Sequence, residues 1–315
     1  MGAHKSGILQ LTPLHNFYQI NLMYYIVYPV LYLLSLLPFV ILYAISDFIA
    51  FLLNHVIGYR KEVVLSNLEI AFPEKTDAER KKIARQFYQY FADSFVETIK
   101  FLSISKKQLL KRTTGTYDEI NRLLKEGASI NLLCGHQFNW EYANLLYSSE
   151  LKVPFVTVYL PVKNKVVNKM MYKIRTRFNA ILVSPAEFGS KLHHVFNAQH
   201  ALVLAADQSP ATPKSGYWIN FFNRPTAFLI GPEKSAIRKK SAVVFVGFKR
   251  VKRGYYHFES VLLTDDASHT DKRGQLTCLY RDALQAAITN DPANYLWSHR
   301  RFKFEWQPEY GNVLG

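Results

Sequence analysis

The sequence predicts an α/β protein with a mostly parallel central sheet flanked by helices and preceded by an N-terminal membrane-anchoring helix. Short apolar runs with abrupt ends predict strands, and segments whose apolar residues recur every three or four positions predict helices. Strands that alternate with helices favour a parallel sheet covered on both faces. A long uncharged stretch near the N-terminus predicts the anchor.

The strands and helices are predicted in turn along the chain. The strands are Ser129–Cys134, Pro154–Tyr159, Ala201–Ala206, Ala242–Phe248 and Tyr255–Leu262, of which the first four are strongly apolar. The helices are Asp77–Leu102, a segment through the 140s, Asn164–Phe178 and Phe188–Gln199. In such sheets ligands bind at the carboxyl ends of the strands, so residues that follow strand ends are the first candidates for a site.

The N-terminal region predicts membrane attachment. No charged residue occurs between Met23 and Ile45, and the apolar pattern continues past Asp47 to Ile57. About twenty apolar residues suffice to cross a bilayer, although Pro29 and Pro38 could kink the helix. A signal peptide or a buried core helix would be alternatives. We therefore divide the chain into a possible upstream extension (1–22), an anchor (23–57) and a single domain (58–315). The basic residues after the anchor favour a domain on the cytoplasmic side.

Composition restricts the class of partner. The net charge of +15 and the pI of about 9.6 indicate an anionic partner, which is nucleic acid, a phosphorylated small molecule or an anionic membrane. The anchor favours the membrane and argues against nucleic acid. The basic groups around Arg238, Lys249, Lys252 and Arg300 are expected to be solvated faces that together hold the domain against anionic headgroups.

The segment Cys134–Glu141 contains the strongest candidate site. His136 follows a predicted strand, and Glu141 comes five positions later. The two side chains can converge if His136 lies in the turn and Glu141 in the first turn of the next helix, with Asn139 as its N-cap. A histidine held by a carboxylate can take a proton from an alcohol. The alternative is a core histidine beside an ordinary glutamate at a helix start.

Other chemistry receives little support. His193, His194 and His200 lack the spacing of a zinc site, so no metal is expected. No Gly-x-Ser-x-Gly elbow or phosphate-binding glycine loop occurs. Cys134 lies within an apolar strand and is expected to be an inert buried thiol. Asp207 and Gln208 follow another strand and should project to the same edge of the sheet as His136.

Several separated motifs carry a resemblance to a known family. They are Tyr59-Arg60 with Asn67-Leu68 and Ala71-Phe72-Pro73-Glu74, His136 to Glu141, Val158-Tyr159 with Asn164, Arg175, Asp207-Gln208, Phe221-Phe222, and Tyr295 to Lys303. Together they resemble the late acyltransferases of lipid A biosynthesis, within the lysophospholipid acyltransferase superfamily. Two departures from the family pattern are Gln137-Phe138, where a Phe-Gly pair is common, and Asn223, where a glycine is common.

The resemblance implies roles for individual residues. It makes His136 the catalytic base and Glu141 its acidic partner. It places Arg175 and Asp207 at the active-site rim. We expect Arg175, Asp207, Gln208 and Asn139 to bind substrate, with Arg175 as a donor to the oxyanion or to a phosphate. The alternative for Asp207 is to cap a helix or to orient Arg175. The bulk of Phe138 so close to His136 is expected to affect the preference for acyl chain length.

The resemblance also implies a function. It implies a membrane-bound O-acyltransferase of the inner membrane that faces the cytoplasm and needs no cofactor beyond an acyl thioester. Acyl carrier protein would be the donor, with CoA as the alternative, and a lipid A precursor would be the glycolipid acceptor. An aminolipid, a phospholipid or an inositol mannoside is the alternative acceptor. A membrane-tethered basic binding protein is a further alternative, but such a protein would not need the His136/Glu141 pair.

Overall fold

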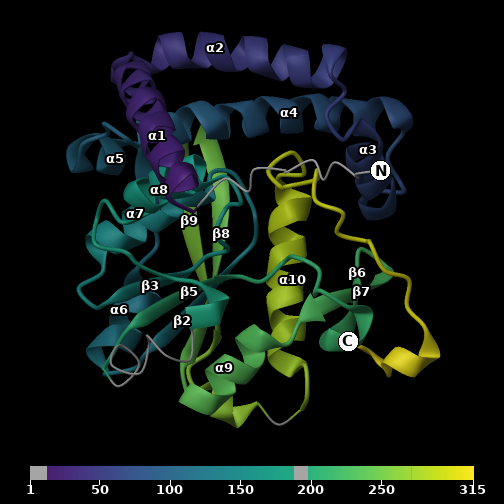
Figure 1. Cartoon of the computed structure of the whole chain (residues 1–315). Coiled ribbons are helices and arrows are strands. Elements are labelled where there is room, and N and C mark those ends of the chain that lie inside the picture. Colours follow the sequence, from purple (N-terminus) through teal and green to yellow (C-terminus); the bar gives the residue numbers. More distant parts are fainter. Residues whose placement is uncertain (1–12, 188–197, 271) are drawn as a thin grey trace, which may run out of the picture.

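A seven-stranded, mostly parallel sheet forms the centre of the molecule (Figure 1). The computed structural model describes residues 13–187, 198–270 and 272–315. The strand order is β1-β9-β8-β2-β5-β3-β4, and only the pair β8 and β9 is antiparallel. The strands are β1 Thr113–Gly115, β2 Ile130–Cys134, β3 Phe155–Val158, β4 Ile181–Val183, β5 Ala201–Ala205, β8 Ala242–Lys252 and β9 Tyr255–Thr264. The predicted fold class is confirmed.

Helices cover both faces of this sheet because its central strands are apolar on both sides. On β2, Leu133 faces the cluster that includes α10 (Gln275–Asn290), whereas Leu132 and Cys134 face the cluster on the opposite side. Successive side chains of a strand point to opposite faces, which explains this division. The second cluster draws residues from α5 (Lys106–Arg112), α6 (Asp118–Lys125), α7 (Trp140–Glu150) and α8 (Lys165–Arg175).

A second, three-stranded sheet lies beside α10 (Figure 1). It contains the hairpin of β6 (Gly216–Phe221) and β7 (Arg224–Leu229), with β10 (Val313–Leu314) parallel to β6. The two-residue turn Phe222-Asn223 has positive φ at both positions, the conformation that matches the twist of a tight hairpin. Asn223 tolerates this region without glycine. The helix α9 (Gly231–Lys239) follows the hairpin and leads into β8.

The predicted anchor forms two helices that Leu37 and Pro38 separate. The helices are α1 (Pro13–Leu36) and α2 (Phe39–Phe51), and α2 continues as the π-helical segment Leu52–Val56. Among the described residues one helix, Phe39–Val56, is long and apolar enough to span a membrane, while the apolar part of α1, Met23–Leu36, is shorter. The helix α1 crosses the predicted boundary at residue 22, and the division of the chain into segments stays a prediction.

The helix α2 packs lengthwise on α4 (Asp77–Lys100), with α3 (Lys61–Ala71) between them in sequence (Figure 1). Leu42, Ser46 and Ala50 recur every four residues and form the buried face of α2. The opposite face is apolar and exposed, with Val40 80% and Phe48 63% accessible. An apolar face of this kind is typical of a membrane-contacting surface.

Most of the predicted elements agree with the structure. Each predicted strand has a counterpart within a few residues, and α4 and α8 match the predicted helices. The predicted helix Phe188–Gln199 falls almost entirely on residues 188–197, which lie outside the described residues. The sequence did not predict β1, β4, the second sheet or α10.

Candidate active site

The register of two adjacent strands brings His136 and Asp207 together. Cys134, the last residue of β2, pairs with Ala205, the last residue of β5. The main-chain N–H of Ala206 then donates to the carbonyl of Cys134 at 3.1 Å, which extends the ladder by one bond. His136 and Asp207 are each two residues beyond the paired strand ends. The prediction that they lie at the same edge of the sheet is therefore confirmed.

Asp207 binds His136 at two points. One carboxylate oxygen, Oδ1, lies 2.6 Å from His136 Nδ1, and the other, Oδ2, accepts the main-chain N–H of His136 at 3.0 Å. When Nδ1 donates its proton to Asp207, Nε2 of the neutral ring is left as the basic nitrogen. The amide nitrogen of Gln208 lies 3.4 Å from Nε2, and the Trp140 ring packs edge-on against the imidazole.

Charge and burial set the ionisation of this pair. Burial by itself would raise the pKa of Asp207, but the charge and hydrogen bonds of His136, with a contribution from Arg301, lower that pKa to about 2. Burial by itself would lower the pKa of His136, but the charge and hydrogen bond of Asp207 raise it above its usual value. The Asp207 side chain is 3% exposed and that of His136 is 19% exposed. A buried carboxylate thus supports a partly exposed imidazole.

Glu141 does not hold His136 through a hydrogen bond, which corrects the pairing predicted from the sequence. Its carboxylate accepts Arg175 Nε at 2.9 and 3.1 Å and Arg175 Nη2 at 2.5 Å, and its Oε1 also accepts the Trp140 indole N–H at 3.1 Å. Glu141 stands in the first turn of α7 and Arg175 in the last turn of α8. The charge of Glu141 still acts to raise the pKa of His136. Its catalytic role stays a prediction.

Asn139 fixes the loop that connects β2 to α7. Its Oδ1 accepts the main-chain N–H of Glu141 at 3.0 Å, which confirms the predicted N-cap. Its Nδ2 donates to Glu97 Oε2 at 3.0 Å. Asn139 is only 1% exposed and both ends of its amide are engaged, so it positions the loop, and its contact with substrate stays a prediction.

Glu97 is a buried carboxylate that the sequence patterns did not single out. Besides Asn139, it accepts hydrogen bonds from the hydroxyls of Tyr43 on α2 at 2.8 Å and Tyr256 on β9 at 2.7 Å. Burial raises the pKa of Glu97. Glu97 could have been identified from the sequence, because it is a carboxylate on the apolar face of the predicted helix Asp77–Leu102. Glu97 links α2 to the loop that carries the candidate site.

Some of the basic residues expected to be solvated are in fact buried. Arg250 binds Asp93 at 2.6 Å with its side chain 6% exposed, and Arg253 bridges Asp93 and Asp47. Arg301 is 1% exposed and donates to the Ala227 carbonyl at 2.8 Å. Paired or buried cations of this kind serve the fold, since an uncompensated buried charge is costly. Their charge is therefore used within the protein and not at a membrane surface.

Phe138 also lies in the core. It is fully buried and packs against Phe87 and Phe91 of α4, with ring centroids 5.9 and 6.1 Å apart. The side chain thus braces the loop after β2 against α4. The predicted influence of Phe138 on acyl chain length stays a prediction.

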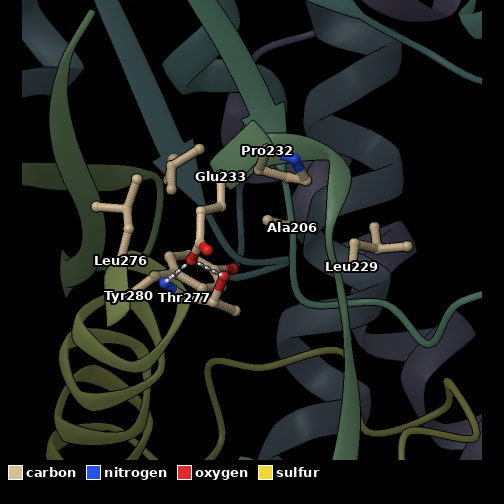
Figure 2. Close-up of a pocket in the computed structure, with 8 residues that line it drawn as sticks. Ala206, Leu229, Pro232, Glu233, Leu276, Thr277 and Tyr280 are labelled. Atoms are coloured by element: carbon tan, nitrogen blue, oxygen red, sulfur yellow. Dashed lines mark hydrogen bonds between the residues drawn. The ribbon is translucent and has the colours of Figure 1, made fainter. Parts of the chain in front are cut away.

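A small cavity lies between β2, α9 and α10, and the residues that line it serve the fold (Figure 2). Its volume of about 10 Å³ leaves no space for a substrate. Figure 2 shows Glu233 directed to Thr277, whose main-chain N–H and hydroxyl it accepts at 2.9 and 2.7 Å. Glu233 thereby fixes the start of α10. Farther along this helix, the Tyr280 hydroxyl donates to the carbonyl of Cys134 at 2.9 Å and braces the strand that leads to His136.

The other reactive side chains among the described residues form no second site. Within the described ranges no group of three metal-ligating side chains comes together. His193 and His194 lie outside those ranges. Burial raises the pKa of the Cys134 thiol, which makes it a poor nucleophile. Burial also lowers the pKa of His299 to about 4, so this imidazole, which accepts the Ser209 N–H at 3.4 Å, is neutral near pH 7.

A partly exposed imidazole on a buried carboxylate, at the carboxyl edge of a parallel sheet, is an arrangement that can act as a general base on a hydroxyl. Comparison with known proteins gives the family. Residues 14–304 match the family described as bacterial lipid A biosynthesis acyltransferase, and the chain belongs to that family.

The curated relatives are distant in sequence but similar in length. The chain is 20% identical to a lipid A biosynthesis lauroyltransferase of Escherichia coli (strain K12) over 276 residues, which cover 87% of this chain and 89% of the relative. It is 21% identical, with the same coverage, to a lipid A biosynthesis palmitoleoyltransferase of that strain and to a lipid A biosynthesis acyltransferase of Shigella flexneri.

Proposed function

We propose that this protein is a membrane-bound O-acyltransferase that transfers a fatty acyl chain from a thioester to a hydroxyl of a lipid A precursor. The observation that carries the proposal is the His136–Asp207 pair, in a chain of the lipid A acyltransferase family. This pair provides the proton acceptor that acyl transfer to an alcohol requires.

The proposed reaction is a direct transfer without an acyl-enzyme. His136 Nε2 removes the proton from the acceptor hydroxyl as the oxygen attacks the thioester carbonyl. The tetrahedral intermediate then collapses, its carbon–sulfur bond breaks, and the departing sulfur takes the proton from the imidazolium. Asp207 keeps the proton of Nδ1 in place and stabilises the imidazolium while it exists.

Arg175 is the proposed donor to the developing oxyanion or to a substrate phosphate. Its Nε and Nη2 bind Glu141, while Nη1 bonds to none of the described residues. The Arg175 side chain is 19% exposed, and Glu141 fixes its orientation. A preorganised cation of this kind stabilises negative charge more effectively than a mobile one. In this proposal Glu141 acts through Arg175 and through its charge on His136.

The exposed apolar faces of α1 and α2 support membrane attachment. Met23, Ile26, Val30 and Leu33 of α1 are each more than half exposed, as is Phe48 of α2. We propose that these faces enter the inner membrane and that the domain faces the cytoplasm, where acyl carrier protein supplies the acyl thioester. The choice of donor and the orientation follow from the family resemblance.

Purified full-length protein tests the proposal directly. It is incubated in detergent micelles with a lipid A precursor, a phospholipid and acyl carrier protein thioester, and the lipids are analysed by mass spectrometry. We expect the precursor to gain one acyl chain with wild-type protein and with His269→Ala, a surface histidine control, but not with His136→Ala. A folded His136→Ala protein that retains more than roughly a tenth of the rate would contradict the base assignment. Acylation of the phospholipid alone would contradict the acceptor.

A further inference from the structure

A basic groove lies between α3 and residues 300–303, which we call the C-terminal segment. Its volume is about 330 Å³, in the lower part of the range of ligand sites. Residues of α3 form one wall, including Glu62 and Asn67. Arg224 of the β6–β7 hairpin and Arg300 and Lys303 of the C-terminal segment supply the positive charge.

The three cations of the groove are not neutralised by ion pairs within the described residues, although Lys303 Nζ lies 4.3 Å from the centre of the Phe304 ring. Arg224, Arg300 and Lys303 form no ion pair with any residue in the described parts of the chain, in contrast to Arg175, Arg250 and Arg253. Arg300 and Lys303 are exposed, and Arg224 lies 5.9 Å from the centre of the Phe302 ring. With Glu62 as the single carboxylate in the lining, the groove has a net charge of about +2. A phosphate monoester carries a charge of about −1.5 to −2 and would neutralise it.

One chain segment connects this groove to the candidate active site. Asn67, in the groove wall, donates through Nδ2 to the carbonyls of Trp297 and His299 at 2.7 and 2.8 Å. Just before residues 297–299, the N–H of Leu296 donates to the carbonyl of His136 at 3.0 Å. Just after it, the carbonyl of Arg301 accepts the Ser209 hydroxyl at 3.0 Å, two residues beyond Asp207. Residues 296–301 therefore contact the active-site strand ends and also supply Arg300 to the groove.

We propose that this groove binds a phosphate group of the acceptor lipid and thereby positions its hydroxyl at His136. The inference rests on the proposed function and deepens it, since it assigns the binding of the acceptor's phosphate to Arg224, Arg300 and Lys303. Arginine binds phosphate oxygens through two parallel hydrogen bonds, and lysine adds a compact charge. The lining of the groove contains three cations, which suits the charged headgroup of the acceptor and not its acyl tail.

The test uses full-length protein with the double substitution Arg300→Gln and Lys303→Gln. The matched control is Lys234→Gln with Arg238→Gln, which removes the same charge from α9, at the opposite end of the molecule from α3 (Figure 1). The probes are a phosphorylated lipid A precursor and the same precursor after phosphatase treatment, each in nonionic detergent micelles. Equilibrium binding without donor gives the Kd, and turnover gives the KM for acceptor and for thioester.

We expect the groove variant to raise the Kd and the acceptor KM for the phosphorylated precursor about tenfold, as the loss of charge-assisted hydrogen bonds predicts. The difference from wild type should disappear with the dephosphorylated precursor. An equal loss with both precursors, a change confined to the thioester KM, or no change in Kd would overturn the proposal. The Kd tests the groove even if wild-type protein transfers no acyl chain. The absence of acyl transfer would contradict the proposed function and not the phosphate site.

Discussion

The substitution Asp207→Asn tests which carboxylate orients His136. The structure indicates Asp207, whereas chain spacing suggested Glu141. The substitution keeps the shape of the side chain but removes the charge that lies 2.6 Å from His136 Nδ1. An asparagine amide can donate to Nδ1, which would leave the proton on Nε2 and remove the base. We expect a loss of roughly 100- to 10,000-fold in kcat, or about 3–5 kcal/mol of transition-state stabilisation.

The same substitution should also lower stability. The pKa of Asp207 falls from its ordinary 3.8 to about 2 in the folded protein, which corresponds to about 2 kcal/mol of stability near neutral pH. Because this folded-state pKa is depressed, the contribution is present above pH 4 and is lost as the pH falls towards 2. Asn at this position would also leave the buried Arg301 without the nearby negative charge. Thermal unfolding of both proteins at pH 7 measures the difference.

Initial rates of Asp207→Asn and Glu141→Gln, measured on folded protein, complete the test. Glu141→Gln leaves the bond to His136 Nδ1 intact and weakens the hold on Arg175, so it should cost less activity than Asp207→Asn and lower the pKa of His136 by less. If Asp207→Asn retains more than roughly a tenth of the wild-type rate while Glu141→Gln abolishes activity, our assignment of the orienting carboxylate is refuted.

Three further outcomes are expected. The acyl-transfer rate should rise with pH through a value above 6.5, because neutral His136 is the base and its pKa is raised. The stability that the protonated ring adds should be lost over the same pH range. A rate independent of pH between 5 and 9 would contradict this. Gly135→Ala places a Cβ 2.5 Å from Cδ1 of the buried Leu284, so calorimetry should show a loss of about 1–3 kcal/mol. Glu97→Gln should cost about 1–3 kcal/mol in denaturant titration, since one carboxylate accepts three buried donors.

Another prediction concerns membrane attachment. Phe48→Asp places a charge on the exposed apolar face of α2, where Phe48 is 63% accessible and lies outside the buried face of Leu42, Ser46 and Ala50. We expect flotation with anionic vesicles to recover less protein, while the unfolding temperature stays within a degree or two of wild type. The matched control is Leu279→Asp on α10, a partly exposed leucine of similar apolarity. Equal recovery of the two variants would show that this face does not contact the membrane.

The sheet and its active edge could be predicted from the sequence because their signals are local. The apolar runs that became β2 and β5 end sharply, and the polar residues that follow them identify His136 and Asp207. The edge strands β1 and β4 contain three residues each, which is too few for a periodic pattern. The second sheet was not predicted either, because its short strands pack against segments distant in the chain. The helix α10 did have a local signal that we missed, since Leu276, Tyr280, Leu284 and Ile288 recur every four residues.

The partner of His136 could not be read from chain spacing. Glu141 is five residues away, whereas Asp207 is 71 positions away and is brought close only by the register of two parallel strands. The environment of Glu97 is likewise formed by residues from α2, the β2–α7 loop and β9. Sequence spacing identifies which residues stand at a strand end, but the pairing among them depends on strand order.

The most direct test of the central claim is mass spectrometry of lipid A from cells that lack the gene and carry wild-type protein or His136→Ala. We predict that the deletion strain has lipid A lighter by one acyl chain, that wild-type protein restores the mass, and that His136→Ala, present at the same level in membranes, does not. Unchanged lipid A in the deletion strain, together with loss of an acylated aminolipid or phospholipid, would contradict the account.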